Sequence, residues 1–197
     1  MYQHEKQLRK QGFEHIAGTD EAGRGPLAGP VVAAAVILPS DYKNPLIQDS
    51  KKLTAMQREK LFVEIKQVAL SFGIGVLGWK QIDQMGILNA SKLAMRRAVL
   101  ALGLPPDFLI SDAVPVNVME LPQKAMVKAD EKVFCVAAAS ILAKVHRDHL
   151  MMKYHKKYPE YGFADHMGYG TKAHLEAIKR HGGCQIHRRS FSPFRPD

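Results

Sequence analysis

Cysteine is scarce in this chain, with only Cys135 and Cys184 among 197 residues. Two cysteines cannot form the disulfide framework that holds small secreted proteins together, so we expect a cytoplasmic protein with reduced thiols. A long hydrophobic run is lacking as well: the longest, Val31–Leu38, is far shorter than the roughly 20 apolar residues that cross a bilayer. The start of the chain, Met1–Gly12, is polar and does not resemble a secretory signal. We therefore expect no membrane partner.

Internal repeats and low-complexity segments are also lacking, which indicates one globular unit that is large enough to bury its own core. Positive charge, by contrast, is in excess: the formal net charge is +9. Residues 144–197 hold eleven Lys and Arg but five Asp and Glu, so most of the excess lies in the last quarter of the chain. Such clustering favours a polyanionic partner, although a merely solvated basic surface gives the same count.

Hydrophobic periodicity and turn residues predict a mixed α/β sheet covered by helices. Strands are expected at residues 15–19, 31–38, 72–77, 107–111 and 124–128. Helices are expected from an N-cap at Thr54 to about Ser71, and at 90–102, 130–158 and 171–181. We interpret residues 1–143 as a core and residues 144–197 as a helical, basic extension packed on it.

Four carboxylates are placed at the ends of expected strands. Asp20 and Glu21 end the first strand, Asp112 ends the fourth, and Asp130 follows the fifth. Residues at strand ends of an open α/β sheet meet in one crevice. Because adjacent residues of a strand point to opposite faces, Asp20 and Glu21 are expected to share a site only if the chain turns at once.

A group of carboxylates with few basic neighbours favours a hard cation. Mg²⁺ and Mn²⁺ prefer oxygen ligands, and two such ions roughly 3.5–4 Å apart can flank a phosphodiester. Each acid taken alone is more simply interpreted as a turn or cap residue. In a basic protein, the four together favour a metal site that acts on nucleic acid.

The segment Gly23–Ala28 matches the loose G-x-G-x-x-A form of a dinucleotide-binding loop. That motif has to open a helix, whose N-terminus holds the pyrophosphate. Here the loop runs through Pro30 into the expected strand at 31–38, so we reject the dinucleotide interpretation. Such a loop can still bring backbone groups close to a sugar or a phosphate.

Five ungapped blocks stand out along the chain: Asp20–Val31, Asp49–Leu53, Ala137–Asp148, Gly168–Thr171 and His187–Phe191. These blocks resemble the motifs of the ribonuclease HII family and follow one another in the family's order. The resemblance covers nearly the whole chain. It implies a ribonuclease H-like fold: a mixed five-stranded sheet flanked by helices, with residues 144–197 as a C-terminal helical, substrate-binding extension.

The resemblance also implies an activity. A member of this family is expected to be an endoribonuclease that hydrolyses the RNA strand of RNA–DNA hybrids. It is expected to incise on the 5′ side of single ribonucleotides embedded in duplex DNA. The mechanism implied is in-line attack of water with two Mg²⁺ or Mn²⁺ ions, leaving 5′-phosphate and 3′-hydroxyl ends. Its partners would be those duplexes, and we expect a monomer.

Roles follow residue by residue from the matched motifs. The resemblance implies that the catalytic acids and metal ligands are Asp20, Glu21, Asp112 and Asp130. It implies that ribose 2′-hydroxyls are recognised, largely through backbone groups, by Gly23, Arg24 and Gly25. Tyr169 would sense the RNA-to-DNA junction by packing on a sugar. Expected phosphate contacts are Ser50, Lys51 and Asn89, together with Arg188 and Arg189 of the basic tail.

The chain departs from the family pattern at three positions. Ala113 and Ala129 stand where glycine is usual, and Met167 stands where a lysine is frequent. The first two predict small backbone changes beside the acids, and the third removes one possible phosphate contact.

Two other function classes remain open from the sequence. A nucleic-acid-binding module without catalysis would use the same basic surface, but it gives no reason for four acids at strand ends. A zinc-stabilised interaction protein would rest on His181, Cys184 and His187, whose spacing is H-x₂-C-x₂-H without a nearby fourth ligand.

Overall fold

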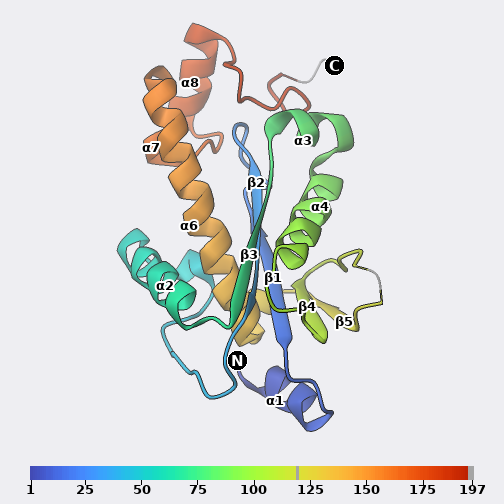
Figure 1. Ribbon diagram of the computed structural model, residues 1–197. Helices are drawn as coiled ribbons and strands as arrows, with labels where there is room; N and C mark the ends of the chain where they lie inside the picture. The colour runs from blue at the N-terminus through green and yellow to red at the C-terminus, as the bar shows by residue number, and fades with distance from the viewer. Residues whose placement is uncertain (119, 195–197) are drawn as a thin grey trace.

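The structure is a computed structural model that describes residues 1–118 and 120–194, built around one five-stranded sheet (Figure 1). The strands are β1 Ile16–Ala22, β2 Val31–Ile37, β3 Ser71–Leu77, β4 Phe108–Asp112 and β5 Gln123–Met126. Their order in the sheet is β3-β2-β1-β4-β5. β2 pairs antiparallel with both β1 and β3, whereas β1, β4 and β5 run parallel. The predicted mixed sheet is therefore confirmed.

Helices cover both faces of the sheet, with α4 on one side and α6 on the other, and α2 packs outside α6 (Figure 1). The larger helices are α1 Gln3–Lys10, α2 Ala55–Val68, α4 Ile87–Leu100, α6 Phe134–Lys157 and α8 Lys172–His181. Shorter helical segments are η1 Ser50–Lys52, α3 Trp79–Met85, α5 Ala129–Lys132, η2 Pro159–Tyr161 and α7 Phe163–His166. Within the described residues, no helix is long and apolar enough to span a bilayer.

The core is built on β2, whose seven residues are all buried. Its side chains alternate between the two faces: Ala33 and Ala35 pack in the cluster beneath α4, and Ala34 and Val36 pack in the cluster beneath α6. Consecutive alanines take little volume on either face, so both helices can lie close to the strand. The sheet that carries the acids is thereby held firmly from both sides.

Local signals account for several helix starts. Thr54 caps α2 as predicted, and Gln57 completes a capping box with it, because each side chain accepts a bond from the other's backbone amide. Thr171 caps α8 by accepting from the amide of His174. Both helices begin one residue after the cap.

The long helix expected from Asp130 to about Tyr158 is wrong at its start. Val133 is extended, with φ −124° and ψ 125°, and it separates the single turn of α5 from α6. The break lets α5 turn away from α6 and hold Asp130 at the sheet edge. The sequence interpretation also missed α1, whose Glu5 caps α6 from a distance by accepting from the amide of Cys135.

The expected boundary after residue 143 falls inside α6, which runs without interruption to Lys157. The first half of α6 lies in the core, and Met151 in its second half packs with the C-terminal cluster around Tyr161 and Phe163. One helix thus joins the expected core and the expected extension. The last three residues of that extension, 195–197, lie outside the described residues.

Candidate active site

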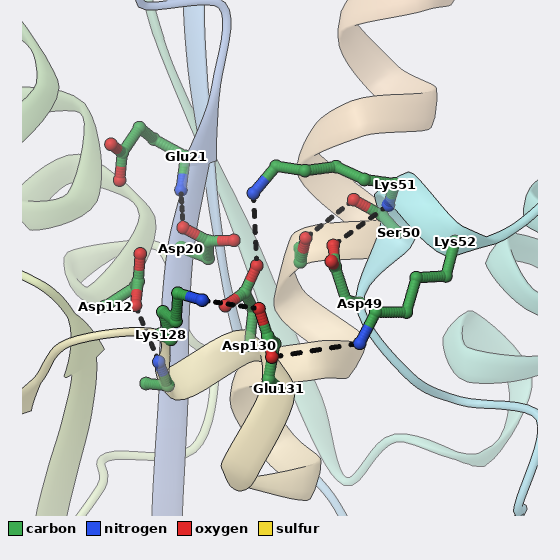
Figure 2. Close-up of polar contacts among 12 residues, drawn as sticks. Asp20, Glu21, Asp49, Ser50, Lys51, Lys52, Asp112, Lys128, Asp130 and Glu131 are labelled. Atoms are coloured by element: carbon green, nitrogen blue, oxygen red, sulfur yellow. Dashed lines mark hydrogen bonds and ion pairs between the residues drawn. The ribbon is translucent and has the colours of Figure 1, made fainter.

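The acids converge on a hollow of about 290 Å³ near the end of β1. Asp20, Glu21 and Asp112 line it, and the buried Asp130 bonds to Lys51, which lines it too (Figure 2). The expectation that Asp20 and Glu21 share a site only through an immediate turn is wrong, because β1 continues to Ala22. Pairing with β4 stops at Thr19, so beyond that residue β1 is paired with β2 alone.

Asp20 is the most deeply placed of the three acids that line the hollow, with 6% of its surface exposed. Burial raises the pKa of its carboxyl well above the ordinary value, and the nearby charges of Glu21 and Asp112 raise it further. One oxygen accepts a bond from the amide of Glu21 at 2.7 Å, which partly offsets these effects. An ionised Asp20 is therefore held at an energetic cost.

Glu21 and Asp112 are under the same constraint. Burial raises the pKa of Glu21, although Arg24, whose Nη1 lies 3.3 Å from Oε1, opposes the shift. Burial also raises the pKa of Asp112, against a 2.7 Å hydrogen bond from the amide of Ala129. The second oxygen of Glu21, Oε2, is buried and has no hydrogen-bond partner in the described part of the protein.

Asp130 has one nearby cation. Lys51 Nζ lies 3.4 Å from its Oδ2, but the lysine side chain is 81% exposed. Burial lowers the pKa of Lys51, and the carboxylates of Asp130 and Asp49 outweigh this effect, so its pKa is raised overall. An exposed ion pair of this kind contributes little, so Lys51 offsets the negative charge of Asp130 only weakly.

This donor set fits a hard divalent cation. Desolvated carboxylates with raised pKa values and a partnerless oxygen are stabilised when a cation supplies the missing positive charge. In residues 1–118 and 120–194, no three His, Cys, Asp or Glu side chains are already arranged around one point as ligands of an ion.

The loop after β1 presents its two glycines differently. Gly23 has φ +99°, and a Cβ there would lie 2.2 Å from Nε of Arg147, so the loop can pack inward only with glycine. A Cβ on Gly25 would meet only the ring of Tyr169, at 3.6 Å. Gly25 therefore lies on the open side, where the missing side chain leaves room for a ligand between the loop and Tyr169.

Tyr169 also lines the hollow, and 46% of its surface is exposed. Its ring is free to meet a ligand, whereas its backbone is held: the carbonyl accepts from the amide of Thr171 at 2.9 Å and faces His174 Nδ1 at 2.8 Å. An exposed aromatic surface on a fixed backbone suits stacking against a sugar.

The remaining expected contacts divide into two groups. Ser50 and Lys51 line the hollow, and the hydroxyl of Ser50 lies 2.8 Å from that of Ser140. Asn89 and Arg189 are not among the residues that line it. Asn89 on α4 donates to the carbonyl of Met85 at the end of α3, and Arg189 donates to that of Gly183.

The expectation that Arg188 contacts phosphate is wrong for this structure. Its side chain is fully buried, and its guanidinium donates to main-chain carbonyls, including those of Gly23 and Arg24. A run of two arginines reads as a basic surface in the sequence, but only Arg189 is exposed.

Two polar residues of the hollow were missed by sequence reasoning, Ser140 and Lys144. Both lie on α6, four residues apart and hence on the same face of the helix. Two polar residues at this spacing, at the edge of an alanine-rich buried run, were the signal that could have found them.

Comparisons with known proteins find relatives along nearly the whole chain. The family profile for Ribonuclease HII matches residues 17–193. A Ribonuclease HII from Desulfitobacterium hafniense is 55% identical over 189 residues, covering 96% of this chain and 73% of the relative.

Two solved structures extend the likeness to the fold. The ribonuclease H2 of Pyrococcus horikoshii OT3 is 31% identical with a TM-score of 0.76, covering 91% of this chain and 95% of that one. Bst-RNase HIII, solved in complex with Mn²⁺, shares the fold alone: it is 18% identical with a TM-score of 0.67, over 91% and 68% of the two chains. On the profile and the sequence identity together, the chain belongs to the ribonuclease HII family.

Proposed function

We propose that this protein cleaves the RNA strand of RNA–DNA hybrids and also incises on the 5′ side of single ribonucleotides embedded in duplex DNA. Its family membership makes it an endoribonuclease of the ribonuclease H class. One observation carries the finer proposal: three of the acids, the Gly23-Arg24-Gly25 loop and Tyr169 line the same hollow. The reacting phosphate and the sugar beside it would therefore be contacted together.

The carboxylates of Asp20, Glu21, Asp112 and Asp130 would hold two Mg²⁺ or Mn²⁺ ions. Such ions, when bound, supply an activated water and charge stabilisation for in-line cleavage to 5′-phosphate and 3′-hydroxyl ends. A solved structure of the same fold contains Mn²⁺, which supports a divalent ion here. The carboxylates themselves would repel the negatively charged phosphate oxygens wherever no cation lies between them. The scissile phosphate would therefore be held only where the metal ions are.

The other residues would position the duplex. The backbone of Gly23-Arg24-Gly25 would meet the ribose 2′-hydroxyl, and the ring of Tyr169 would pack on the neighbouring sugar. Phosphates would be contacted by Ser50, Lys51, Asn89 and Arg189. We add Lys144 to the proposed phosphate contacts because it lines the hollow, and we remove Arg188 because it is buried.

The basic extension, residues 144–197, would bind the part of the duplex that lies beyond the cleavage site. We further propose a cytoplasmic location, which the free thiols of Cys135 and Cys184 support, and a monomeric state. A binding module without catalysis leaves the cluster of desolvated acids without a purpose, because uncompensated carboxylates repel phosphate.

A cleavage assay tests the proposal. End-labelled duplexes would be an RNA–DNA hybrid, DNA with one ribonucleotide, all-DNA and all-RNA, each with Mg²⁺, with Mn²⁺ and with EDTA. We expect cleavage of the first two only, with either metal, and 5′-phosphate products by mass spectrometry. Cleavage in EDTA, or of the all-DNA duplex, would contradict it.

A further inference from the structure

Two arginines of the C-terminal half are buried in the interior. Arg147 on α6 is 1% exposed and Arg188 is fully buried. Burial lowers the pKa of Arg147 to about 10, and burial together with the charge of Arg147 lowers that of Arg188 to about 9. Among the described residues, neither forms an ion pair with a carboxylate. Two desolvated cations persist only if their N–H groups are well satisfied.

The partners of Arg188 are the carbonyls of the loop after β1. Nη2 donates to Gly23 O at 2.6 Å, Nη1 donates to Arg24 O at 2.9 Å, and Nε donates to Gly29 O at 3.0 Å. Nη2 also reaches Pro30 O at 3.2 Å. The planar guanidinium thus binds both ends of the loop at once, which a lysine ammonium cannot do with the same geometry.

Arg147 extends the same arrangement to a second loop. It donates to Pro30 O at 3.0 Å and to Ala28 O at 3.2 Å. Its Nη1 donates to Met167 O at 3.0 Å, two residues before Tyr169. The loop after β1 and the Tyr169 loop are therefore tied to one side chain.

These bonds fix the direction of two amides. In a trans peptide the C=O and the following N–H point opposite ways. Since Gly23 O and Arg24 O point inward to Arg188, the amides of Arg24 and Gly25 point outward, and both residues line the hollow. Neither amide has an acceptor among the described residues. Two adjacent, unused donors face the place where a ligand would lie.

We propose that Arg188 is a positioning residue that aims the Arg24 and Gly25 amides at the 2′-oxygen of the scissile ribonucleotide, with Arg147 holding Tyr169 in register. This inference rests on the proposed function, in which that loop meets the ribose. Arg188 itself does not touch the substrate. It acts by setting the peptide planes before the substrate arrives, so that no reorientation is needed on binding.

The segment that carries Arg188 is anchored separately. Asp83 on α3 accepts from the amides of Arg189 and Ser190, each at 2.9 Å, and from the Ser190 hydroxyl at 2.7 Å. Loosening this anchor displaces Arg188 without leaving a hole or an unpaired charge in the interior. Asp83→Asn is therefore a second, gentler variant that tests the same idea.

The experiment measures selectivity. The substrates are a DNA duplex with one ribonucleotide and the same duplex with 2′-deoxy-2′-fluororibose at that position, which removes the hydroxyl. The proteins are wild type, Arg188→Lys, Asp83→Asn and, as control, Arg97→Lys, whose arginine donates to Val76 O on β3. Rates are read well below each variant's melting temperature, so that only folded protein is compared.

We expect the hydroxyl preference in kcat/KM to fall about tenfold or more in Arg188→Lys, less in Asp83→Asn, and not in Arg97→Lys. KM should change little, because phosphate contacts lie elsewhere. An unchanged preference in folded Arg188→Lys overturns the inference. If that variant does not fold, an unchanged preference in Asp83→Asn overturns it.

The wild type separates this inference from the function on which it rests. Wild-type cleavage of both substrates at equal rates also overturns the inference, because the 2′-oxygen is then not read. A wild type that cleaves neither substrate with Mg²⁺ or Mn²⁺ means that the proposed function itself has failed, and the inference fails with it.

Discussion

The carboxylate of Asp112 accepts a hydrogen bond from the amide of Ala129 at 2.7 Å, and this contact joins the end of β4 to the first turn of α5 (Figure 2). Asp130 follows directly, so one bond sets the spacing of the third and fourth acids. The geometry of the site therefore depends on backbone conformation at residues 113 and 129, where the family usually has glycine. Ala129 is helical, but Ala113 has φ +56°.

Ala113→Gly should raise the free energy of unfolding by about 0.5–1 kcal/mol. Glycine removes the strain that alanine suffers in the left-handed conformation of the folded state. This gain exceeds the loss that comes from the greater conformational entropy of glycine in the unfolded state. The matched control is Ala173→Gly on α8, an exposed helical alanine, which should lower stability by a similar amount. Urea titrations of the three proteins measure this, and a loss of stability in Ala113→Gly would contradict the argument.

Asp20→Asn should abolish cleavage yet make the metal-free protein more stable at pH 7. The raised pKa of Asp20 means that the folded state disfavours its ionised form, so this residue costs stability once pH exceeds its ordinary value of 3.8. The gain in the variant should therefore disappear at low pH. Exposed Asp41→Asn is the control, and melting temperatures in EDTA measure the effect.

The same two proteins test ligation. Adding Mg²⁺ or Mn²⁺ should raise the melting temperature of the wild type, since ligand binding to the folded state stabilises it. Asp20→Asn should respond much less. An equal metal response in both proteins would remove Asp20 from the ligand set.

Replacing Tyr169 should harm a single embedded ribonucleotide more than a long hybrid. A long hybrid offers many 2′-hydroxyls as further contacts, whereas the single ribonucleotide depends on the ring that packs on the adjoining deoxyribose. Tyr169→Phe should fall between wild type and Tyr169→Ala. The measurement is kcat/KM on both substrates. Equal losses on the two would show that the ring does not sense the junction.

Binding should weaken steeply with salt, and Lys51→Ala should reduce the slope of log Kd against log salt by about one. Lys51 is exposed at the rim of the hollow, in contrast to the buried Arg188. Lys10→Ala, exposed on α1 before the start of β1, should leave the slope unchanged. Binding titrations in EDTA at several salt concentrations measure these slopes. Identical slopes for wild type and Lys51→Ala would show that Lys51 does not contact phosphate.

A chain of hydrogen bonds behind Tyr169 predicts a pH effect. His174 Nδ1 must donate to Tyr169 O, so its Nε2 accepts from His187 Nε2 at 3.1 Å, and His187 Nδ1 accepts from the Cys184 thiol. Burial and the neighbouring His174 lower the pKa of His187 to about 4. An added proton would find no acceptor.

Stability should therefore fall between about pH 6.5 and pH 4, where the unfolded state takes up the proton and the folded state does not, by up to about 3 kcal/mol. His187→Gln should be less stable at pH 7.5 but lose less on acidification. His181→Gln, at an exposed position, is the control. Parallel pH profiles for wild type and His187→Gln would exclude this role.

The sequence alone determined the strands and the mixed sheet, and it proposed the four acids, because each depends on local order along the chain. A continuous apolar run predicts the buried strand at 31–38, and turn residues mark its end. The blocks around Asp20, Tyr169 and His187 are contiguous motifs, so their resemblance to one family needs no knowledge of distant contacts.

Only the tertiary structure decided which side chains face the hollow and which support it. Arg188 and Arg189 are adjacent and chemically alike, yet the first is buried against the carbonyls of Gly23 and Arg24 and the second is exposed. Ser140 and Lys144 reach the hollow because α6 crosses beneath it. Burial depends on what packs from elsewhere in the chain, and a local sequence pattern carries no information about that.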